Sequence, residues 1–480
     1  MSTREYDVIV LGGGIGGYTA AIRASQLGKK AAVVERDKLG GTCLHRGCIP
    51  SKALLRSAEL YETMRDSVSY GIVAEHVRVD FQAVQQRKNK IVGQLYSGLQ
   101  FLMKKHKIDV YTGNGRVIGP SIFSPRSGSL AVEAENEEES VTLVAPYTIL
   151  ATGSRPSALP GLEVDGKRIV TSDEALEMQE LPASAVIIGG GVIGCEWASM
   201  LQDFGVKVTL VEAADRLLPA EDRDVSRELE RLFKKRGIDV YTQSKLDIKS
   251  VENTGSAVEL TVERKNEPVR LQADMMLVAV GRKANVDGLG LENTDVRVEN
   301  GLIRVNEHYQ TTESHIYAVG DCIGGYQLAH AAAHEAVAAV EHLAGVKKPA
   351  AVLGPAASAL VPRCVYSRPE TASVGWTEEE AVRHGHAVKV GKISFKALGK
   401  ALVHGQNDGF VKVVADKDTN DLLGVHMIGP HVTDLIAEAG IAQLLDATPW
   451  EIGQFAHPHP SLSEALAEAM LAVDGQALGS

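Results

Sequence analysis

The feature of this chain that most constrains its fold is an internal repeat. Residues 7–35 and 185–212 each contain a β-branched strand, a glycine turn, an amphipathic helix, a further glycine and a second strand that ends in glutamate. The matching positions all differ by 177 and are Gly12/Gly189, Gly14/Gly191, Gly17/Gly194, Gly28/Gly205 and Glu35/Glu212. Five matches at one offset predict two βαβ nucleotide folds in one chain.

Each glycine turn carries the chemistry of a dinucleotide site. The first glycine makes the turn, the second lets the backbone approach a pyrophosphate, and the third permits close packing of helix on strand. The helix N-terminus offers N–H groups to the phosphates, and Glu35 and Glu212 are placed to accept a hydrogen bond from a ribose 2′-hydroxyl. For either motif alone, a glycine turn without a ligand is the alternative. An acid at Glu212 would repel a 2′-phosphate and favours NAD over NADP, although Arg216 softens that preference.

Later segments indicate how these folds close. Apolar strands that end in glycine, at 148–153 and 275–281, are expected to complete the two nucleotide folds. A Pro/Ala-rich connector at 347–360 separates the first 346 residues from the remainder. In that remainder short strands alternate with helical segments, as in an α+β domain.

Composition narrows the functional classes. At about 150 residues per domain, 480 residues suggest three or four domains. A net charge of −11 argues against a general nucleic-acid binder. The apolar stretch at 8–22 is too short and too broken by glycine to span a bilayer, and no secretory signal is recognisable, so we expect a cytoplasmic protein without membrane association. Five cysteines do not make a disulfide scaffold, so a close cysteine pair indicates catalysis or metal binding.

Such a pair is present at Cys43 and Cys48. In a regular helix, residues five apart hold their Cα atoms beyond the limit of about 7 Å for a disulfide, so Cys43 is expected in a loop or distorted turn, which Gly47 permits. Pro50 suits the first helical position, which places Cys48 near a helix N-terminus, where a thiolate is favoured. Two inert thiols or half of a metal site are the alternatives. A metal would need two more clustered ligands, and the other three cysteines lie singly, so no metal is predicted and those cysteines are expected in the core.

The segment that contains this pair, GGTCLHRGCIPSKALL at 40–55, resembles the active-site segment of the flavoprotein disulfide reductases (class I pyridine nucleotide-disulfide oxidoreductases), and CIPSKALL is most similar to the dihydrolipoamide dehydrogenases among them. Further similar segments follow in the same order at 150–156, 280–285, 315–335, 369–378 and 457–465. The resemblance spans essentially the whole chain. It implies an α/β fold with two Rossmann-like dinucleotide-binding domains and a C-terminal α+β dimerisation domain. The implied boundaries are 1–154 (FAD-binding), 155–275 (NAD-binding), 276–349 (completing the FAD site) and 350–480 (interface).

The same resemblance assigns roles to individual residues. Cys43 would exchange with the substrate, Cys48 would face the flavin, and Lys52 would lie near the reactive end of the flavin, paired with Glu196. Implied FAD contacts are Gly12, Gly14, Gly17, Glu35, Lys52, Gly115, Thr152, Gly153, Ser154, Asp321, Gln327, Leu328, Ala329 and His330. Implied NAD contacts are Gly189, Gly191, Ile193, Gly194, Glu212, Leu246 and Gly281.

A candidate base lies near the C-terminus, at His459. Dithiol oxidation needs a base to form the attacking thiolate, and histidine titrates near neutrality. Glu464 can fix the imidazole if the chain turns at Pro460. From the residues alone, an ordinary surface or core histidine is the more frequent outcome. The resemblance implies that His459 is the base and that His457 is a non-catalytic neighbour.

For function, the resemblance implies a dihydrolipoamide:NAD⁺ oxidoreductase with FAD and NAD as cofactors, the flavoprotein component of a 2-oxo acid dehydrogenase complex. It implies a homodimer in which the C-terminal histidine completes the partner's site, and a lipoyl-bearing acyltransferase as protein partner. Which complex is served stays open, with a lean towards a branched-chain one.

Two other functions are weighed against this one. An NAD(P)H-dependent disulfide reductase of the glutathione or mercuric reductase type is disfavoured by Glu212 and by Lys52 after Ser51. A redox-inactive binding subunit is disfavoured by the intact set Cys43, Cys48, His459 and Glu464. The chain departs from its relatives at His45 and Arg46, often Asn and Val, and at Ser461, more usually Thr.

Overall fold

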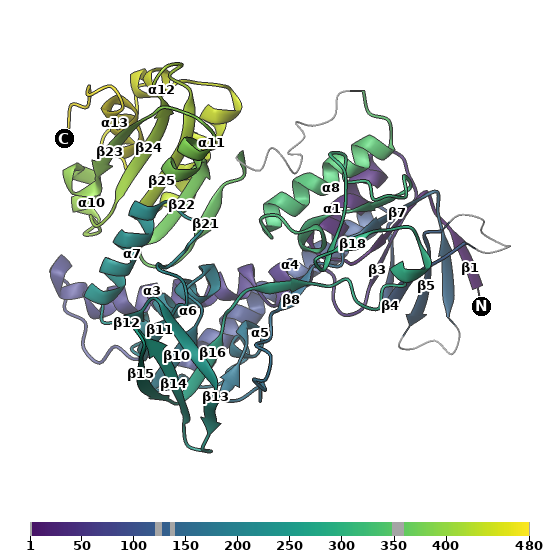
Figure 1. Cartoon of the computed structure of the whole chain (residues 1–480), viewed down its shortest axis with the longest axis horizontal. Coiled ribbons are helices and arrows are strands. Elements are labelled where there is room, and N and C mark those ends of the chain that lie inside the picture. Colours follow the sequence, from purple (N-terminus) through teal and green to yellow (C-terminus); the bar gives the residue numbers. More distant parts are fainter. Residues whose placement is uncertain (1, 121–126, 135–139, 348–359, 480) are drawn as a thin grey trace. The chain divides into compact units, whose positions relative to one another are not determined.

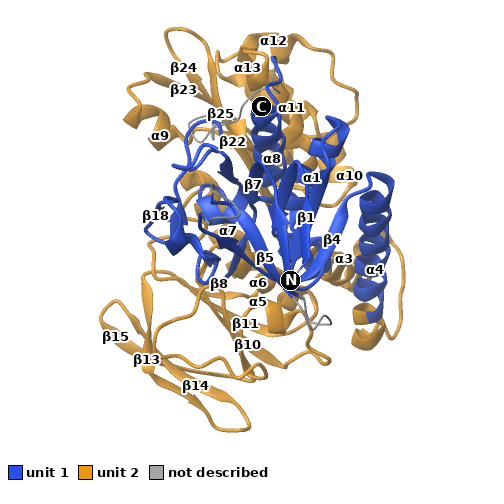
Figure 2. Cartoon of the chain, turned by 90° about the vertical axis from the view of Figure 1, so that its right-hand side faces the viewer, with its two compact units in different colours: residues 1–51, 86–156, 282–358 blue, residues 52–85, 157–281, 359–480 orange. Residues whose placement is uncertain are grey.

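The computed structural model describes residues 2–120, 127–134, 140–347 and 360–479 (Figure 1). The chain forms two compact units, each assembled from three separate stretches (Figure 2). Unit 1 comprises residues 1–51, 86–156 and 282–358, and unit 2 comprises residues 52–85, 157–281 and 359–480. Most of the connector predicted at 347–360 lies outside the described residues. The predicted four-part domain division stays a prediction.

Unit 1 is built on an eight-stranded sheet in the order β1-β6-β5-β4-β3-β2-β7-β20. Its strands are β1 (Ser2–Glu5), β2 (Val8–Leu11), β3 (Ala31–Glu35), β4 (Asp109–Ile118), β5 (Ser129–Ala134), β6 (Val141–Val144), β7 (Tyr147–Leu150) and β20 (Ile316–Ala318). The helices and short strands used below are α1 (Ile15–Gln26), α2 (Gly41–His45), α8 (Ala329–Leu343), the 3₁₀ turn η3 (Gly320–Ile323), β8 (Ser154–Pro156) and β17 (Arg282–Ala284). Helices α3 (Cys48–Arg65) and α4 (Phe81–Lys105) run across the boundary between the units.

Unit 2 contains a parallel sheet in the order β12-β11-β10-β16-β9 and an antiparallel sheet in the order β21-β22-β25-β24-β23. The parallel strands are β9 (Ile169–Val170), β10 (Ser184–Ile188), β11 (Lys207–Val211), β12 (Asp239–Tyr241) and β16 (Met275–Val278), accompanied by α5 (Ser172–Ala175), α6 (Val192–Asp203) and α7 (Arg223–Lys235). A separate antiparallel sheet is formed by β13 (Ser244–Asn253), β14 (Val258–Arg264) and β15 (Glu267–Ala273).

The C-terminal sheet of unit 2 is α+β, as the alternating pattern predicted. Its strands are β21 (Arg363–Val365), β22 (Glu370–Gly375), β23 (Val388–Ser394), β24 (Phe410–Asp416) and β25 (Leu422–Gly429), and its helices are α9 (Glu378–Arg383), α10 (Gly399–Val403), α11 (Val432–Leu444), α12 (Pro449–Gln454) and α13 (Glu464–Ala472). Every residue of β24 and β25 is buried, because α11 and α13 pack against the sheet and its strands contribute a shared apolar core.

The sequence repeat is confirmed as two copies of one supersecondary unit. β2–α1–β3 and β10–α6–β11 are each a parallel βαβ unit, and the predicted closing strands β7 and β16 pair in parallel with β2 and β10. All four residues of β2 are buried, as expected of a parallel strand covered on both faces. Among the described residues, no helix combines the length and apolar character that a membrane span requires.

Candidate active site

The first and third glycines of the two turns have the same geometry. Gly12 and Gly189 have φ angles of 105° and 110°, a region that favours glycine. A Cβ atom on Gly17 would lie 1.8 Å from the carbonyl oxygen of Gly12, and one on Gly194 would lie 1.8 Å from that of Gly189. The third position must therefore be glycine for the helix to pack on its strand.

The second glycines leave a surface that suits a phosphate. A Cβ atom on Gly191 would meet no atom within 4 Å, and one on Gly14 none nearer than 4.0 Å. These residues are the N-caps of α1 and α6, with no side-chain hydrogen bond and no acid in the first turn. By contrast, α5, α9 and α12 are closed by capping boxes at Thr171, Thr377 and Thr448. The open N–H groups of α1 and α6 fit the pyrophosphates of two dinucleotides.

The two acids at the strand ends have a second role that the sequence did not reveal. Oε2 of Glu35 accepts the backbone N–H of Gly13 at 2.7 Å, and Oε2 of Glu212 accepts that of Gly190 at 2.6 Å. The other oxygen of each accepts the N–H two residues further on, at 3.0 and 2.6 Å. Each acid therefore braces its glycine turn, and a carboxylate keeps lone pairs for a ribose hydroxyl.

Ser154 and Asp321, both predicted FAD contacts, are brought together in unit 1. Ser154 Oγ donates to Asp321 Oδ2 at 2.5 Å. Arg282, which no sequence argument singled out, donates from Nε to Ser154 Oγ at 2.7 Å and from Nη2 to its carbonyl oxygen at 2.9 Å. The pairing of β8 with β17 sets this geometry. Arg282 lies in segment 280–285, one of the segments that resemble the family. That resemblance was the signal that could have identified it.

Three other predicted FAD residues also have structural contacts. Thr152 Oγ1 donates to the carbonyl oxygen of Asn285 at 2.7 Å, and the carbonyl oxygen of Gly153 accepts the Asn285 N–H at 2.9 Å. A Cβ atom on Gly115 would lie 2.6 Å from Leu11 Cδ1, so strand packing already requires glycine there. Their contact with FAD stays a prediction.

The predicted helix start at Gln327–His330 is confirmed. Helix α8 begins at Ala329 with Leu328 as N-cap, and Gln327 has a positive φ of 48°. The N-cap residue Leu328 makes no side-chain capping hydrogen bond to this helix.

Among the predicted NAD residues, Ile193 and Leu246 are partly buried against apolar cores of unit 2. Gly281 has a φ of 112°, and its carbonyl oxygen accepts the N–H of Ser157 at 3.0 Å. The guanidinium of Arg216 donates to the Pro219 carbonyl oxygen at 3.1 Å. That hydrogen bond anchors Arg216 beside its own loop, which weakens the argument that it receives a 2′-phosphate.

Cys43 and Cys48 form a close pair in unit 1. The chain folds back between them, because a Cβ atom on Gly47 would lie 3.6 Å from Cys43 Cα. Burial, followed by the electrostatic influence of both sulfurs, raises the pKa of the Tyr18 phenol. One aromatic residue of α1 therefore faces both members of the pair.

Two local details of this segment correct the expectations. Cys43 lies in the short helix α2 and not in a loop, and the break falls after it, at Arg46, whose φ is −135°. Helix α3 begins at Cys48 itself, so Pro50 is its third residue and not its first. The position of Cys48 at a helix N-terminus is confirmed, and the first-turn N–H groups favour its thiolate.

The remaining cysteines are not placed for thiol exchange. Cys195 and Cys322 are fully buried, as predicted for core residues, and Cys364 is partly buried. Burial raises the pKa of Cys322 and of Cys364 to about 12, and also raises that of Cys195. These groups stay thiols near neutral pH.

His45 and Arg46, two of the three positions at which the sequence is expected to depart from the family pattern, have local contacts. His45 Nε2 lies 2.8 Å from the carbonyl oxygen of Leu39, and its ring meets Tyr96 edge to face at 5.3 Å. Arg46 forms an ion pair with Asp37. Both contacts tie the segment between Cys43 and Cys48 to neighbouring parts of unit 1.

Lys52 and Glu196 form the predicted ion pair. Lys52 Nζ lies 2.9 and 2.8 Å from the two carboxylate oxygens of Glu196, whose side chain is 7% exposed. Tyr366 joins them, with its backbone N–H donating to Glu196 Oε1 at 3.0 Å and its ring centroid 4.7 Å from Lys52 Nζ. The sequence argument missed Tyr366, because no spacing relates it to residues so distant along the chain.

His459 and Glu464 meet as predicted. His459 Nδ1 lies 2.8 Å from Glu464 Oε1, and Glu464 Oε2 accepts the backbone N–H of Ser461 at 2.8 Å. The Ser461 hydrogen bond, opposed by a smaller effect of burial and assisted by the His459 contact, lowers the pKa of Glu464 and keeps it ionised. The His459 side chain is 79% exposed, which leaves Nε2 accessible.

The neighbouring histidine differs in its surroundings. His457 is 4% exposed at its side chain. Its Nε2 lies 2.7 Å from Glu438 Oε1, and its Nδ1 lies 2.9 Å from the carbonyl oxygen of Phe455. With both ring nitrogens engaged, His457 is suited to a structural role.

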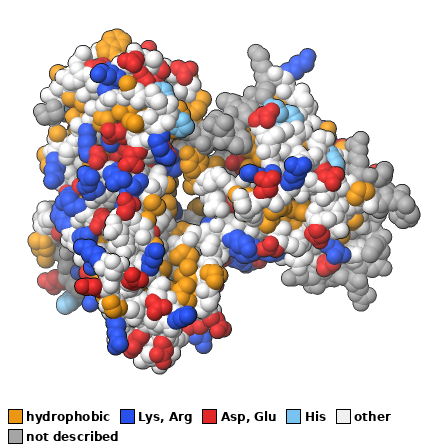
Figure 3. Space-filling model, in the orientation of Figure 1, with side chains coloured by type: hydrophobic (Ala, Val, Ile, Leu, Met, Phe, Trp, Pro, Cys, Tyr) orange, Lys and Arg blue, Asp and Glu red, His pale blue; other side chains and the backbone are white. Residues whose placement is uncertain are grey.

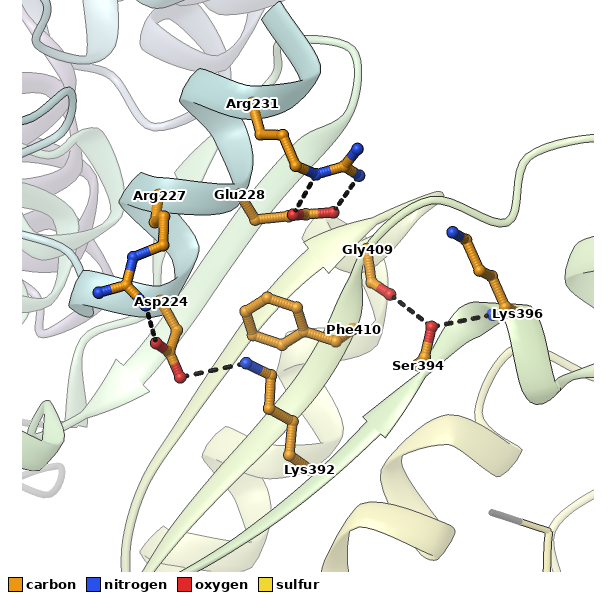
Figure 4. Close-up of a pocket in the computed structure, with 9 residues that line it drawn as sticks. All are labelled: Asp224, Arg227, Glu228, Arg231, Lys392, Ser394, Lys396, Gly409 and Phe410. Atoms are coloured by element: carbon orange, nitrogen blue, oxygen red, sulfur yellow. Dashed lines mark hydrogen bonds and ion pairs between the residues drawn. The ribbon is translucent and has the colours of Figure 1, made fainter. Parts of the chain in front are cut away.

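The cavities of unit 2 include the following two. One, of about 590 Å³, is lined by Lys52 and Tyr366 among others. The other, of about 470 Å³, lies between α7 and β23 (Figure 4). In it Arg231 pairs with Glu228, and Lys392 pairs with Asp224. Figure 3 shows basic and acidic side chains interleaved over this part of the surface, so opposite charges largely compensate one another there.

Comparison with known proteins agrees with this geometry. The family model described as pyridine nucleotide-disulphide oxidoreductase matches residues 6–336, and the dimerisation-domain model of the same family matches residues 361–470. The chain is 60% identical to a dihydrolipoyl dehydrogenase of Bacillus subtilis over 99% of both chains, and 41% identical to one of Rhizobium etli over 99% of both. It resembles the crystal structure of LpdA from Mycobacterium tuberculosis with a TM-score of 0.87 and 26% identity, covering 98% of this chain and 99% of that one.

These matches bear on cofactors, assembly and family. The two nucleotide folds bind FAD and NAD, the cofactors that the family uses. The matched dimerisation domain supports a homodimer. The fold class predicted from the repeat and the resemblance is confirmed. By its fold, its paired glycine turns and its close cysteine pair, the chain belongs to the pyridine nucleotide-disulphide oxidoreductase family.

Proposed function

We propose that the chain is a dihydrolipoyl dehydrogenase, which oxidises protein-bound dihydrolipoyl groups with NAD⁺ as the flavoprotein component of a 2-oxo acid dehydrogenase complex. The observation that carries this proposal is the close pair of Cys43, in α2, and Cys48, at the start of α3. The match of this chain to dihydrolipoyl dehydrogenases over nearly the whole length of both sequences supports the proposal. The lipoyl-bearing acyltransferase partner and a cytoplasmic location belong to the same proposal.

The chemistry begins with thiol–disulfide exchange. His459, oriented by Glu464, removes a proton from one dihydrolipoyl thiol. The resulting thiolate attacks Cys43 Sγ of the Cys43–Cys48 disulfide, and Cys48 leaves as a thiolate stabilised at the α3 N-terminus. The second substrate thiol then displaces Cys43 and closes the lipoyl disulfide, and its proton passes to the departing Cys43 sulfur, so that two electrons have passed to the cysteine pair. FAD, held at the glycine turn of Gly12, Gly14 and Gly17, would supply the two-electron carrier between the cysteine pair and NAD⁺.

The remaining residues hold this chemistry in place. Gly12, Gly14 and Gly17 would receive one dinucleotide, with Glu35 bracing the turn and accepting from the ribose. The equivalent turn with Glu212 would receive NAD, and the ribose-binding acid disfavours NADP. The ammonium of Lys52, fixed by Glu196, would lie near the reactive end of the flavin.

Anaerobic titration of the holoenzyme with NADH and then NADPH tests this function. We expect NADH to produce, at two electrons, the long-wavelength band of a thiolate beside oxidised flavin. Cys48→Ser should abolish that band and lipoamide turnover. Cys364→Ser is the matched control, because burial keeps that thiol protonated, and it should retain both. Bleaching of the flavin without the band in the unmodified enzyme would contradict the mechanism, and a strong preference for NADPH would favour a glutathione-type reductase.

A further inference from the structure

Tyr366 contacts both members of the Lys52–Glu196 pair. It follows β21 directly, far from either residue in the sequence. Its backbone N–H donates to Glu196 Oε1 at 3.0 Å, and the face of its ring lies below the Lys52 ammonium, with 4.7 Å between Nζ and the ring centroid. One residue thus holds the carboxylate through its backbone and the ammonium through its side chain.

The position of Tyr366 is fixed independently of its ring. The backbone N–H of Arg368 donates to Ser199 Oγ at 2.8 Å, and the Arg368 guanidinium donates to Asp203 Oδ1 at 2.6 Å. Glu196, Ser199 and Asp203 are spaced by three and four residues in α6, so they lie on one face of that helix. The segment 366–368 therefore runs along α6 through bonds that a change of the Tyr366 side chain would leave in place.

The ring has an electrostatic effect on Lys52. The two residues line the 590 Å³ cavity of unit 2, and the Lys52 side chain is 32% exposed. An ammonium over the face of an aromatic ring is attracted to its negative π surface, and the ring displaces water from one side of the charge. Without the ring, the flexible side chain of Lys52 has room to turn further into the cavity.

We infer that Tyr366 is a positioning residue for Lys52, and that its ring holds the ammonium on Glu196 and out of the neighbouring cavity. This inference rests on the proposed function, which places the Lys52 charge beside the flavin. The charge at that place stabilises the electron-rich states of the flavin and of the adjacent thiolate. Loss of the ring therefore changes the redox equilibrium between flavin and cysteine pair, and not merely the stability of the fold.

Two variants of the full-length holoenzyme isolate the contribution of the ring, and a third tests Lys52. Tyr366→Phe keeps the aromatic face, Tyr366→Leu removes it, and both keep the backbone N–H that binds Glu196. The readouts are the thiolate–flavin band at two electrons and the midpoint potential of the flavin. Tyr366→Leu should weaken the band by roughly two- to fivefold, the range expected for a partly exposed cation–π contact, and Tyr366→Phe should match the unmodified enzyme. If Tyr366→Leu folds poorly, pentafluorophenylalanine in place of Tyr366 keeps the ring shape, inverts its electrostatics and should give the same loss.

Lys52→Met, the third variant, separates this inference from the proposed function. If Lys52→Met leaves band and potential unchanged, the proposed role of Lys52 is wrong and the inference falls with it. If Lys52→Met alters them and Tyr366→Leu does not, the inference alone is overturned. The double variant should equal Lys52→Met, and any further loss in it would mean that the ring acts elsewhere, which also overturns the inference.

Discussion

At the scale of single residues, the third glycine of each turn has no room for a side chain. A Cβ atom on Gly17 or on Gly194 would lie 1.8 Å from a backbone carbonyl oxygen. Overpacking of this kind costs about 1–3 kcal/mol or more. If the turn shifts to relieve the overlap, the affinity for the dinucleotide falls by roughly ten- to hundredfold. We expect Gly17→Ala to be purified with little FAD, and Gly194→Ala to keep FAD and lose NADH affinity by that factor, measured by flavin absorbance and NADH titration.

A matched control for these variants is available in α4. A Cβ atom on Gly93 would meet nothing within 4 Å, so Gly93→Ala should leave both cofactors bound and favour the helix by a few tenths to about 1 kcal/mol. If Gly17→Ala lost NADH affinity and kept its full flavin content, the first turn would bind NAD and not FAD. That result would contradict the order of the two cofactors proposed here.

At the scale of elements, α7 and β24 are joined by a buried ion cluster. Lys412 Nζ lies 3.0 Å from Asp222 Oδ1 and 2.7 Å from Glu378 Oε2, and the side chains of Lys412 and Asp222 are 4% and 2% exposed. Removing one partner of a buried pair leaves an uncompensated charge and costs about 3–5 kcal/mol. We expect Lys412→Met to lower the free energy of unfolding by that amount in urea denaturation.

The chain offers two controls for the ion cluster. Asp222→Asn added to Lys412→Met removes the stranded charge and keeps the N-cap of α7, so it should recover much of the loss. Lys389→Met breaks a more exposed pair with Asp474 and should cost about 0–1 kcal/mol. Equal costs at Lys389 and Lys412 would show that burial does not govern this contact.

The turn after β24 makes a second element-scale prediction, on pH. Hydrogen bonds from the Thr419 backbone and from His386 lower the pKa of Asp416 to about 2. Because the pKa is lower in the folded state, the stabilisation is complete above the unfolded value of about 4 and is lost as pH falls towards 2. Asp416→Asn should lower the melting temperature near neutral pH, and the gap should close as pH falls through this window. A gap of the same size at every pH in this window would contradict this cause.

At the scale of the whole molecule, the resemblance to the family implies a homodimer in which His459 of one subunit completes the site that contains the cysteine pair of the other. In a heterodimer of Cys48→Ser and His459→Gln chains, one of the two shared sites keeps both an intact cysteine pair and an intact histidine. Random pairing then predicts about a quarter of the unmodified lipoamide turnover from two chains that are inactive alone. The measurement is turnover of the mixture after co-expression with two different tags.

The same experiment has an outcome that would contradict the shared site. If His459 served the cysteines of its own chain, every site in the mixture would be defective and turnover would stay at the level of the single variants. Light scattering identifies variants whose chains do not assemble. A charged substitution at an exposed apolar residue of α11 or α12, such as Leu444 or Trp450, should weaken a dimer and serves as the reference for the unassembled state.

Much of the architecture and of the candidate site was predictable from local sequence. The strand–glycine–helix–glutamate order specifies a βαβ unit because turn geometry, helix packing and phosphate contact each demand glycine at a fixed spacing. The same holds for Cys48 at a helix start and for His459 near Glu464, since both relations span only a few residues. The prediction that Cys43 lies in a loop or distorted turn was wrong, because spacing alone does not distinguish a loop from a five-residue helix capped by Arg46.

Only the tertiary structure decided the contacts between distant segments. Tyr366 on Lys52, Arg282 on Ser154 and the bracing of Gly13 by Glu35 depend on which strand ends and helices the fold brings together. A sequence pattern reports the period of one element, whereas such contacts follow from sheet order, in which each compact unit is assembled from three separate stretches of chain. The sequence by itself determined the two nucleotide folds and the redox pair, and the packing of those stretches determined which side chains hold the reactive groups in place.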